Sequence, residues 1–382
     1  MIKLKKLFVF LIMLSTLLFV NGCHFNSSSD SPSCFLPVDQ LQSMLDASVS
    51  DNGAPGAILA VRVGDCSWVG AAGKSNLVTG EQMTPDMQVR LASVTKSLTA
   101  IIVMKLVEEN ILSLNDTLEK WLPGKVNRGS EMTVKMLLCH RAGVYSLTEL
   151  ENFWTEMLAD PQKDWSSDEI LAKTNPLTPM FTPGKEFYYT NTGYYLLGMI
   201  VEAATGNPLS DEIQKRILAP HSLMHTNLTR QGFMAAPNEH GYTLLPTIVG
   251  VVDTANWNLS WDWTAGSGVS TGIDMLNLAD ALFSGRILSP ETVDLMVTPT
   301  EEGGYGLGIG KTTLFNTTVI GHTGANPGTA TYWYYFPHYK TTIFVAVNGE
   351  GQMLSPHQKE PIIEGGQYVY NIFEKTWTIL HP

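Results

Sequence analysis

The chain has 382 residues, of which 44% are hydrophobic and 16% are charged, so it can bury a large core in one or two domains. Its formal net charge of −12 argues against nucleic acid and anionic lipid as binding partners, because both repel an acidic surface. The four cysteines include no CxxC pair, so a zinc ribbon or a thiol-redox motif has no support.

The first residues are typical of an export signal. Three lysines precede an apolar run at residues 7–20, which is too short to cross a bilayer comfortably. The sequence VNGC then resembles a bacterial lipobox, with Cys23 as the lipidated residue. We therefore expect a signal peptide at 1–22 and a polar tether at 23–36, which would anchor an exported protein to the membrane of the cell envelope. The alternative is an uncleaved anchor.

Cysteine and histidine positions suggest one disulfide and no metal site. Export would allow a disulfide between Cys34 and Cys66, with Cys139 as the odd cysteine. His221 and His225 are four residues apart, but the residues between them lack the glutamate of a zinc-protease helix. We expect neither a metal nor an organic cofactor.

The first third of the chain predicts a hairpin followed by a helix. The β-rich run AILAVRV at 57–63 predicts a strand, and CSWVGAAG, after Gly64-Asp65, predicts its antiparallel partner. From Ser93 to about Glu109, apolar residues recur at helical spacing, which indicates a buried amphipathic helix.

The rest of the chain changes from helical to strand-like patterns. Its middle third shows short helical segments (TVKMLLCHRAG, SSDEILAKT and NTGYYLLGMIVEAATG), and Gly206-Asn207-Pro208 is a helix stop. The later helical pattern GIDMLNLADALFSG precedes three strand-like runs, YGLGI, TYWYYF and TTIFVAV. These patterns predict an α+β fold in which both terminal parts build one sheet, with an α/β domain at 37–115 and 265–382 and a mainly helical domain at 116–264.

Ser93 and Lys96 are the first candidate catalytic residues. They stand three residues apart in LASVTKSLTA, at the start of the predicted helix. Ser93 could be a helix cap beside a solvated lysine, or one helical turn could place the ammonium beside the hydroxyl and activate it as a nucleophile. The pair is a weak signal by itself, and a serine nucleophile also needs an oxyanion hole.

Two later stretches contain groups that could complete such a site. FYYTNTGYYLLG places Tyr189 and Asn191 two residues apart on the approach to a helix, where a core tyrosine and a helix cap are the alternative interpretation. IGHTGANPGTATYWYYF puts His322, Thr323 and Gly324 at the head of a predicted strand. Gly324 leaves room there for a ligand against the strand edge, although many strands simply begin this way.

The motifs SVTK, YTN and HTG occur in this order, and the connecting sequences LLCHRAG, TPGKEFYYTNTGYYLLGMIVE and AGSGVSTGIDM accompany them. The chain thereby resembles the serine penicillin-recognising family, which contains D-alanyl-D-alanine carboxypeptidases and class C β-lactamases. The resemblance covers most of residues 40–350. It implies a β-lactamase/transpeptidase-like fold, with an antiparallel sheet flanked by helices and a mainly helical insert.

The resemblance also implies a role for the reacting side chains. Ser93 would be the nucleophile and Lys96 its hydrogen-bonded partner one turn later. Tyr189 would be the general base, which requires Lys96 and His322 to stabilise its phenolate, because the unperturbed pKa of tyrosine is about 10.

Substrate-binding roles follow from the same resemblance. Asn191 would bind the acyl-side amide of the substrate, and His322 with Thr323 would receive the carboxylate of the leaving group. The backbone N–H groups of Ser93 and Ala325 would form the oxyanion hole.

The third motif carries His322 where lactamases of this family usually have lysine and some carboxypeptidases have histidine. We therefore expect a D-alanyl-D-alanine carboxypeptidase-like serine hydrolase that acts on cell-wall peptides. Some of those enzymes hold the terminal carboxylate with an arginine after the YGLGI run, a place where this chain has Lys311 as a point charge. A β-lactamase, an esterase and a D-aminopeptidase are alternatives within the family, and an inactive penicillin-binding or sensor lipoprotein is an alternative of another class.

A second serine motif is present at 268–272, where GVSTG satisfies the GxSxG pattern with Ser270 as nucleophile. That motif must follow a buried parallel strand, whereas the preceding NLSWDWTAG is polar and interrupted by tryptophans. We therefore expect Ser270 to lie in a turn that leads into the next helix.

Overall fold

The computed structural model describes residues 35–52, 54–175, 179–244, 251–300, 303–349 and 367–382. The predicted signal peptide, Cys23, Cys34 and all but the last two residues of the predicted tether lie outside these ranges. Within them, no helix combines the length and apolar character needed to cross a membrane.

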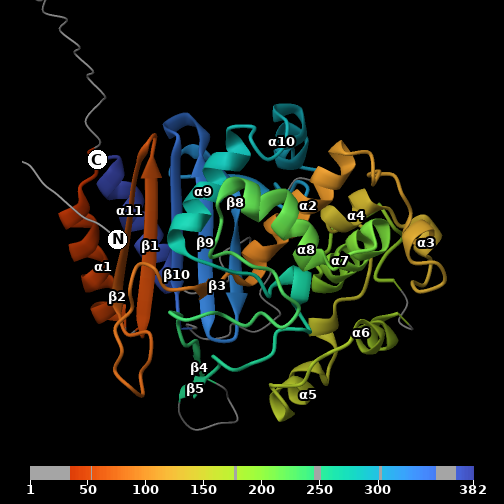
Figure 1. The fold of residues 1–382 in the computed structure, drawn as a ribbon, viewed down its shortest axis with the longest axis horizontal. Helices are drawn as coiled ribbons and strands as arrows, with labels where there is room; N and C mark the ends of the chain where they lie inside the picture. Colours follow the sequence, from red (N-terminus) through yellow and green to blue (C-terminus); the bar gives the residue numbers. More distant parts are fainter. Residues whose placement is uncertain (1–34, 53, 176–178, 245–250, 301–302, 350–366) are drawn as a thin grey trace, which may run out of the picture. The chain divides into compact units, whose positions relative to one another are not determined.

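A six-stranded antiparallel sheet joins the two ends of the described chain (Figure 1). Its strand order is β2-β1-β10-β9-β8-β7, and β1 pairs with β10 so that Ala57 lies opposite Val347. This arrangement confirms the predicted sheet built from both terminal parts. The strands are β1 (Gly56–Val63), β2 (Cys66–Gly73), β7 (Gly310–Leu314), β8 (Thr317–Asn326), β9 (Thr329–Phe336) and β10 (Thr341–Val347).

Both faces of this sheet are covered, which explains why β1 is apolar along most of its length rather than alternating. Ala57, Leu59 and Val61 pack in the cluster formed with α1 (Val38–Asn52) and α11 (Gln367–Leu380). The intervening Ile58 and Ala60 belong to the larger cluster on the other face. Figure 1 shows α1 and α11 on one side of the sheet and the remaining labelled helices on the other side.

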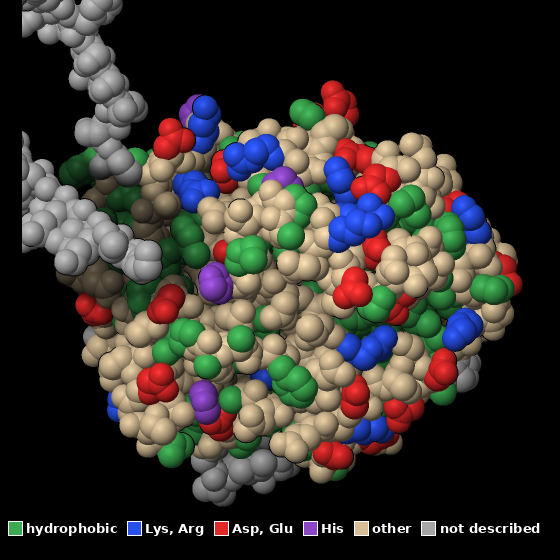
Figure 2. Space-filling view, viewed as in Figure 1, with side chains coloured by type: hydrophobic (Ala, Val, Ile, Leu, Met, Phe, Trp, Pro, Cys, Tyr) green, Lys and Arg blue, Asp and Glu red, His purple; other side chains and the backbone are tan. Residues whose placement is uncertain are grey.

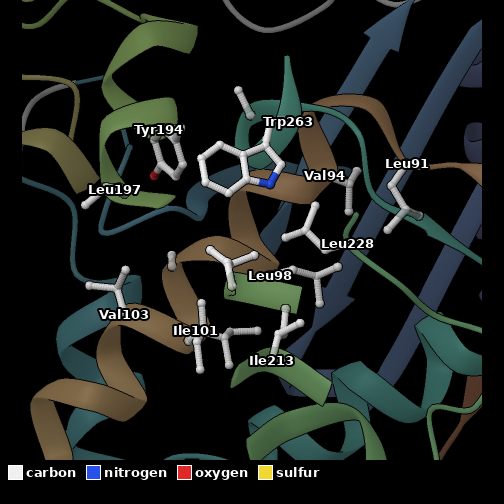
Figure 3. Close-up of a cluster of buried hydrophobic side chains, with 14 of the residues drawn as sticks. Leu91, Val94, Leu98, Ile101, Val103, Tyr194, Leu197, Ile213, Leu228 and Trp263 are labelled. Atoms are coloured by element: carbon white, nitrogen blue, oxygen red, sulfur yellow. The ribbon is translucent and has the colours of Figure 1, made fainter. Parts of the chain in front are cut away.

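The second face carries α2 (Thr95–Glu108), α9 (Gly272–Phe283) and the predicted helical insert. In Figure 3, Leu98 and Ile101 of α2 lie in one buried cluster with Leu197, Ile213 and Trp263 of the insert. The remaining helices are α3 (Leu118–Trp121), α4 (Val134–Leu138), α5 (Phe153–Ala159), α6 (Ser167–Thr174), α7 (Asn191–Thr205), α8 (Leu209–Ile213) and α10 (Pro290–Val297). The domain limits at 37–115, 116–264 and 265–382 stay predictions.

Local sequence accounts for the ends of these helices. Ser166 accepts the N–H of Glu169, whose side chain accepts the Ser166 N–H, so a capping box begins α6. Gly206 ends α7 with φ +73°, as the Gly-Asn-Pro stop predicts. Two short strand pairs complete the sheets: β3 (Val89–Arg90) with β6 (Val269–Ser270), and β4 (Tyr242–Leu244) with β5 (Val251–Asp253). The remaining short elements are the 3₁₀-helical turns η1 (Ala92–Val94), η2 (Gly129–Glu131), η3 (Leu147–Glu149), η5 (Ala219–His221), η6 (Trp263–Ala265) and η7 (Pro337–Tyr339), and the π-helical segment η4 (Gln214–Leu218).

Two strand predictions are wrong in detail. YGLGI is a bent segment rather than a strand, because Gly308 has φ +79° and packs against α2. The HTG motif lies in the second half of β8 rather than at its head. Strand β8 begins earlier because Phe315 and Asn316, with φ +49° and +59°, form a tight two-residue turn after β7. That turn lacks the glycine by which such hairpins are usually found in a sequence.

Candidate active site

Ser93 lies in the turn η1, directly before α2. The preceding Ala92 has φ +46°, a left-handed conformation that is rare for a residue with a side chain. Leu91 holds the turn in place from two sides: its N–H donates to the Gly268 carbonyl at 2.8 Å, and its carbonyl accepts from Thr331 Oγ1 at 2.9 Å. The serine is therefore presented on a backbone that its surroundings constrain.

Lys96 follows one turn later, and its side chain is fully buried. Its Nζ donates to Ser93 Oγ at 3.1 Å and to the Ala265 carbonyl at 2.9 Å. Burial lowers the pKa of Lys96 to about 8, while the nearby Asp262 carboxylate opposes this shift. A neutral Lys96 amine is thus accessible closer to neutral pH than for an ordinary lysine, and it lies within proton-transfer distance of the serine.

Tyr189 lies beside the same serine and lysine. Its hydroxyl lies near the Ser93 side chain, and Lys96 Nζ lies 4.8 Å from the centre of its ring. The residue is 37% exposed, so part of the ring borders solvent. Burial raises the pKa of Tyr189 well above its ordinary value, and Tyr305 raises it further. These pKa shifts favour Lys96 over Tyr189 as the proton acceptor, and the base role of Tyr189 stays a prediction.

His322 is buried, and both of its ring nitrogens have partners. Nδ1 lies 2.5 Å from the Thr323 carbonyl, which can only accept, so Nδ1 carries the proton. Nε2 then accepts from the Tyr305 hydroxyl at 3.0 Å. Burial lowers the pKa of His322 to about 3, with a further lowering by Lys96. His322 is therefore a neutral ring that supplies no positive charge to a Tyr189 phenolate, and its carboxylate-binding role stays a prediction.

The edge of β8 passes very close to the nucleophile. A Cβ atom on Gly324 would lie 2.5 Å from the Leu91 carbonyl oxygen and 2.8 Å from the Ser93 nitrogen, so only glycine permits this approach. The next residue, Ala325, is exposed, and the role of its N–H in an oxyanion hole stays a prediction. On the other wall, Asn191 begins α7, and its Oδ1 is buried without a hydrogen-bond partner among the described residues.

Residues 41–364 match the sequence profile of the family described as Beta-lactamase. The chain belongs to the Beta-lactamase family. This result confirms the resemblance deduced from the three motifs. It also agrees with the site: a serine nucleophile with a lysine one turn away is the arrangement of a Beta-lactamase-family serine hydrolase.

Curated relatives of this Beta-lactamase family member include a penicillin-binding protein and Protein flp. Penicillin-binding protein 4* of Bacillus subtilis (strain 168) is 25% identical over 313 residues, which cover 76% of this chain and 67% of that protein. Protein flp of Staphylococcus aureus (strain MW2) is 28% identical over 231 residues. The match covers 58% of this chain but only 44% of Protein flp, so this chain spans less than half of that relative.

Solved structures of a D-stereospecific amidohydrolase and of a D-amino acid amidase are also similar to this chain. A D-stereospecific amidohydrolase from Streptomyces sp. has a TM-score of 0.76 and 29% sequence identity, covering 89% of this chain and 98% of that one. The D-amino acid amidase from Ochrobactrum anthropi SV3, in complex with L-phenylalanine amide, has a TM-score of 0.77 and 26% identity, covering 90% and 98%. These structures confirm the predicted β-lactamase-like α+β fold.

Sequence reasoning did not single out several residues beside the site. Tyr305 and His140 pack around Tyr189, with ring centroids 6.3 and 4.3 Å from its ring. Asp262 is buried near Lys96, and burial raises the pKa of its carboxyl group. Asn326 lies near Asp262, and its Nδ2 donates to the Gly266 carbonyl at 2.9 Å. These residues lie in the segments LLCHRAG, YGLGI, DWTAG and HTGAN, but nothing local in those segments marks which side chain faces the serine.

The competing serine is not accessible. Ser270 is fully buried, and its hydroxyl lies 2.8 Å from Thr226 Oγ1, which also contacts Asp274. Ser270 is the last residue of β6, where it pairs with Val89, and Thr271 connects it to α9, so the prediction that Ser270 lies in a turn is wrong. Substrate could not reach Ser270 without local unfolding.

The other predicted positions have mixed outcomes. Cys66 is disulfide-bonded and Cys139 is a buried free thiol, whereas the proposed partner Cys34 lies outside the described residues, so that pairing stays a prediction. Among the described residues, no group of three or more His, Cys, Asp and Glu side chains could hold a metal ion. Lys311 is exposed on β7, and its role as a carboxylate partner stays a prediction.

Proposed function

We propose that the protein hydrolyses amide bonds through an acyl-enzyme on Ser93. The observation that carries this proposal is the 3.1 Å contact between Lys96 Nζ and Ser93 Oγ in a buried site where the lysine pKa is lowered. Neutral Lys96 accepts the hydroxyl proton while Ser93 Oγ bonds to the substrate carbonyl carbon. The bond to the leaving amine then breaks, and the amine takes the proton that Lys96 gained.

Deacylation repeats these steps with water as the nucleophile. Lys96 accepts a proton from water, directly or relayed through the Tyr189 hydroxyl, while the water oxygen bonds to the acyl carbon. The bond from that carbon to Ser93 Oγ then breaks, Oγ takes the proton back from Lys96, and the free acid leaves. The N–H groups of Ser93 and Ala325 bind the oxyanion in both steps. The unpartnered Oδ1 of Asn191 is an acceptor for an N–H group on the acyl side of the substrate.

The side chain expected to bind the leaving group, His322, favours a leaving group without a carboxylate. His322 is neutral and has both nitrogens occupied by Thr323 and Tyr305, so it has no donor for a carboxylate. The similar structures of a D-stereospecific amidohydrolase and a D-amino acid amidase support D-amino-acid amides as the substrate class. Carboxypeptidase-like cleavage of cell-wall peptides is the second candidate, supported by the penicillin-binding relative, and it would need Thr323 or Lys311 to bind the carboxylate.

Two peptides that differ only at the C-terminus test this assignment: acetyl-D-alanyl-D-alanine and its C-terminal carboxamide. We expect the purified protein to cleave the carboxamide and D-phenylalanine amide, and to cleave the free acid at least ten times more slowly. Ser93→Ala should abolish turnover, whereas Ser270→Ala, the matched control, should retain it. Faster cleavage of the free acid would instead establish the carboxypeptidase activity.

Three further probes distinguish an amidase from a β-lactamase, an esterase and an inactive binding protein. Turnover of a cephalosporin that exceeds turnover of the amides would indicate a β-lactamase. Turnover of a short p-nitrophenyl ester without cleavage of any amide would indicate an esterase. Covalent labelling of Ser93 by a fluorescent penicillin without turnover of any substrate would indicate a penicillin-binding or sensor protein.

We further propose that the protein is exported and attached to the membrane of the cell envelope by a lipid on Cys23. The support is the sequence VNGC after a basic and apolar start. We expect Cys23→Ala to move the protein from the detergent phase to the aqueous phase on partition, and unchanged partition would indicate an uncleaved anchor.

Basic and acidic side chains are interspersed on the face shown in Figure 2, which gives no support to a nucleic-acid partner.

A further inference from the structure

His140 is a buried residue whose backbone and side chain both bind the segment that carries Tyr189. It follows α4, has φ +57° and is 1% exposed. Its carbonyl oxygen accepts the N–H of Tyr188 at 2.9 Å, and its Nδ1 accepts the N–H of Thr190 at 3.2 Å. One residue therefore binds the two backbone N–H groups that flank Tyr189.

The two N–H groups resemble the pair of donors that an extended segment offers to a neighbouring strand. Thr190 is in the extended conformation, with φ −142° and ψ 130°. In extended backbone, N–H groups two residues apart point to the same side, roughly 6.6 Å from each other, and the side chain between them stands perpendicular to these bonds, on the face opposite to that of its two neighbours. The carbonyl and the imidazole of His140 thus replace the two acceptors of a neighbouring strand, which orients Tyr189.

The ring of His140 also packs against the side chain of Tyr189. The two ring centroids are 4.3 Å apart with an angle of 34° between the planes, and the rings of Tyr194 and Tyr305 lie at 5.1 and 4.8 Å. Since Nδ1 accepts a backbone N–H, the proton of the neutral ring is on Nε2, which has no hydrogen-bond partner among the described residues. A buried unpaired donor is unfavourable, and the acceptor bond of Nδ1 offsets that cost.

We propose that His140 is a positioning residue that sets the Tyr189 hydroxyl at Ser93, through its acceptor bonds to Tyr188 and Thr190 and its ring contact with Tyr189. This proposal rests on the proposed acyl-enzyme function. It assigns His140 no contact with substrate, and its effect is transmitted only through Tyr189.

Two amide variants separate the acceptor from other properties of His140. In His140→Asn the side-chain oxygen takes the place of Nδ1, and asparagine tolerates the left-handed backbone. In His140→Gln the oxygen lies one bond further out, near the place of Nε2. We expect kcat on the D-amino-acid amide to stay within about five-fold of wild type for Asn and to fall at least about ten-fold further for Gln, with KM changed little in either.

A double-mutant cycle with Tyr189→Phe provides the decisive readout. If His140 acts through the Tyr189 hydroxyl, His140→Gln should cost little more in kcat once that hydroxyl is absent. Equal kcat values for the Asn and Gln variants, or losses that multiply fully in the double variant, would overturn the proposal. Melting temperatures of all variants identify any loss that comes from folding. If the proposed acyl-enzyme function were wrong, the wild-type protein would show no hydrolysis that depends on Ser93. That outcome is distinct from the outcomes that would overturn the role of His140.

Discussion

Burial disfavours the charged form of each titratable side chain around Ser93. It lowers the pKa of Lys96 and of His322 and raises the pKa of Tyr189. The site therefore combines a neutral imidazole and a neutral phenol with a lysine that loses its proton readily. This combination suits a lysine base better than the tyrosinate that the family resemblance implies.

The pH dependence of catalysis tests which residue titrates. Activity requires the neutral form of Lys96, so kcat/KM should rise with pH, with a midpoint near the lowered Lys96 pKa of about 8. Tyr189→Phe should lower turnover by about 10²- to 10⁴-fold if its hydroxyl takes part in proton transfer, and we expect the same rising limb to persist in that variant. Loss of the limb in Tyr189→Phe would identify Tyr189 as the titrating base. Steady-state rates measured across neutral and alkaline pH provide the test.

Strand β8 and the turn η1 meet at Ser93. They approach this closely because residue 324 is a glycine, which has no side chain. Strand β8 approaches η1 at Gly324, where no Cβ atom fits between the strand and the Leu91–Ser93 backbone. The turn is thereby held between the edge of the sheet and the start of α2, and β8 brings Ala325 next to Ser93.

Gly324→Ala should therefore separate β8 from η1. The added Cβ would lie 2.5 Å from the Leu91 oxygen, so we expect turnover to fall at least ten-fold and stability by about 1–3 kcal/mol, as for other overpacked sites. Gly310→Ala in β7 is the matched control, because its nearest contact would be 3.4 Å. Similar kinetics and similar unfolding midpoints for the two variants would show that the close approach does not matter.

On the scale of the whole molecule, a buried carboxylate links segments that are far apart in the sequence. Glu239 Oε1 accepts the N–H of Arg90 in β3 and the hydroxyl of Thr329 in β9, both at 3.2 Å. Burial raises the pKa of Glu239 to about 7, although these hydrogen bonds and the charge of Arg90 oppose the shift. Glu239 is therefore a group through which pH acts on the stability of the fold.

The sign of this effect follows from linkage. Because the folded-state pKa of Glu239 exceeds its ordinary value of 4.5, the stability that its protonated form contributes is complete below about pH 4.5 and is lost as pH rises through about 7. We expect the free energy of unfolding of wild type to fall across this pH range relative to that of Glu239→Gln, which keeps the shape and does not titrate. Denaturant unfolding at several pH values measures the difference, and parallel curves would contradict the prediction.

The sequence by itself determined the three motifs SVTK, YTN and HTG, the helix that follows Ser93, and the strands at 57–63 and 341–347. Their information is local: it lies in residue spacing, hydrophobic period and helix stops. Only the tertiary structure decided the protonation of His322, the contacts of Tyr305 and His140 around Tyr189, and the true start of β8. The physical reason is that a pKa, a tautomer and a packing contact depend on burial and on neighbours brought from distant parts of the chain, which no local pattern records.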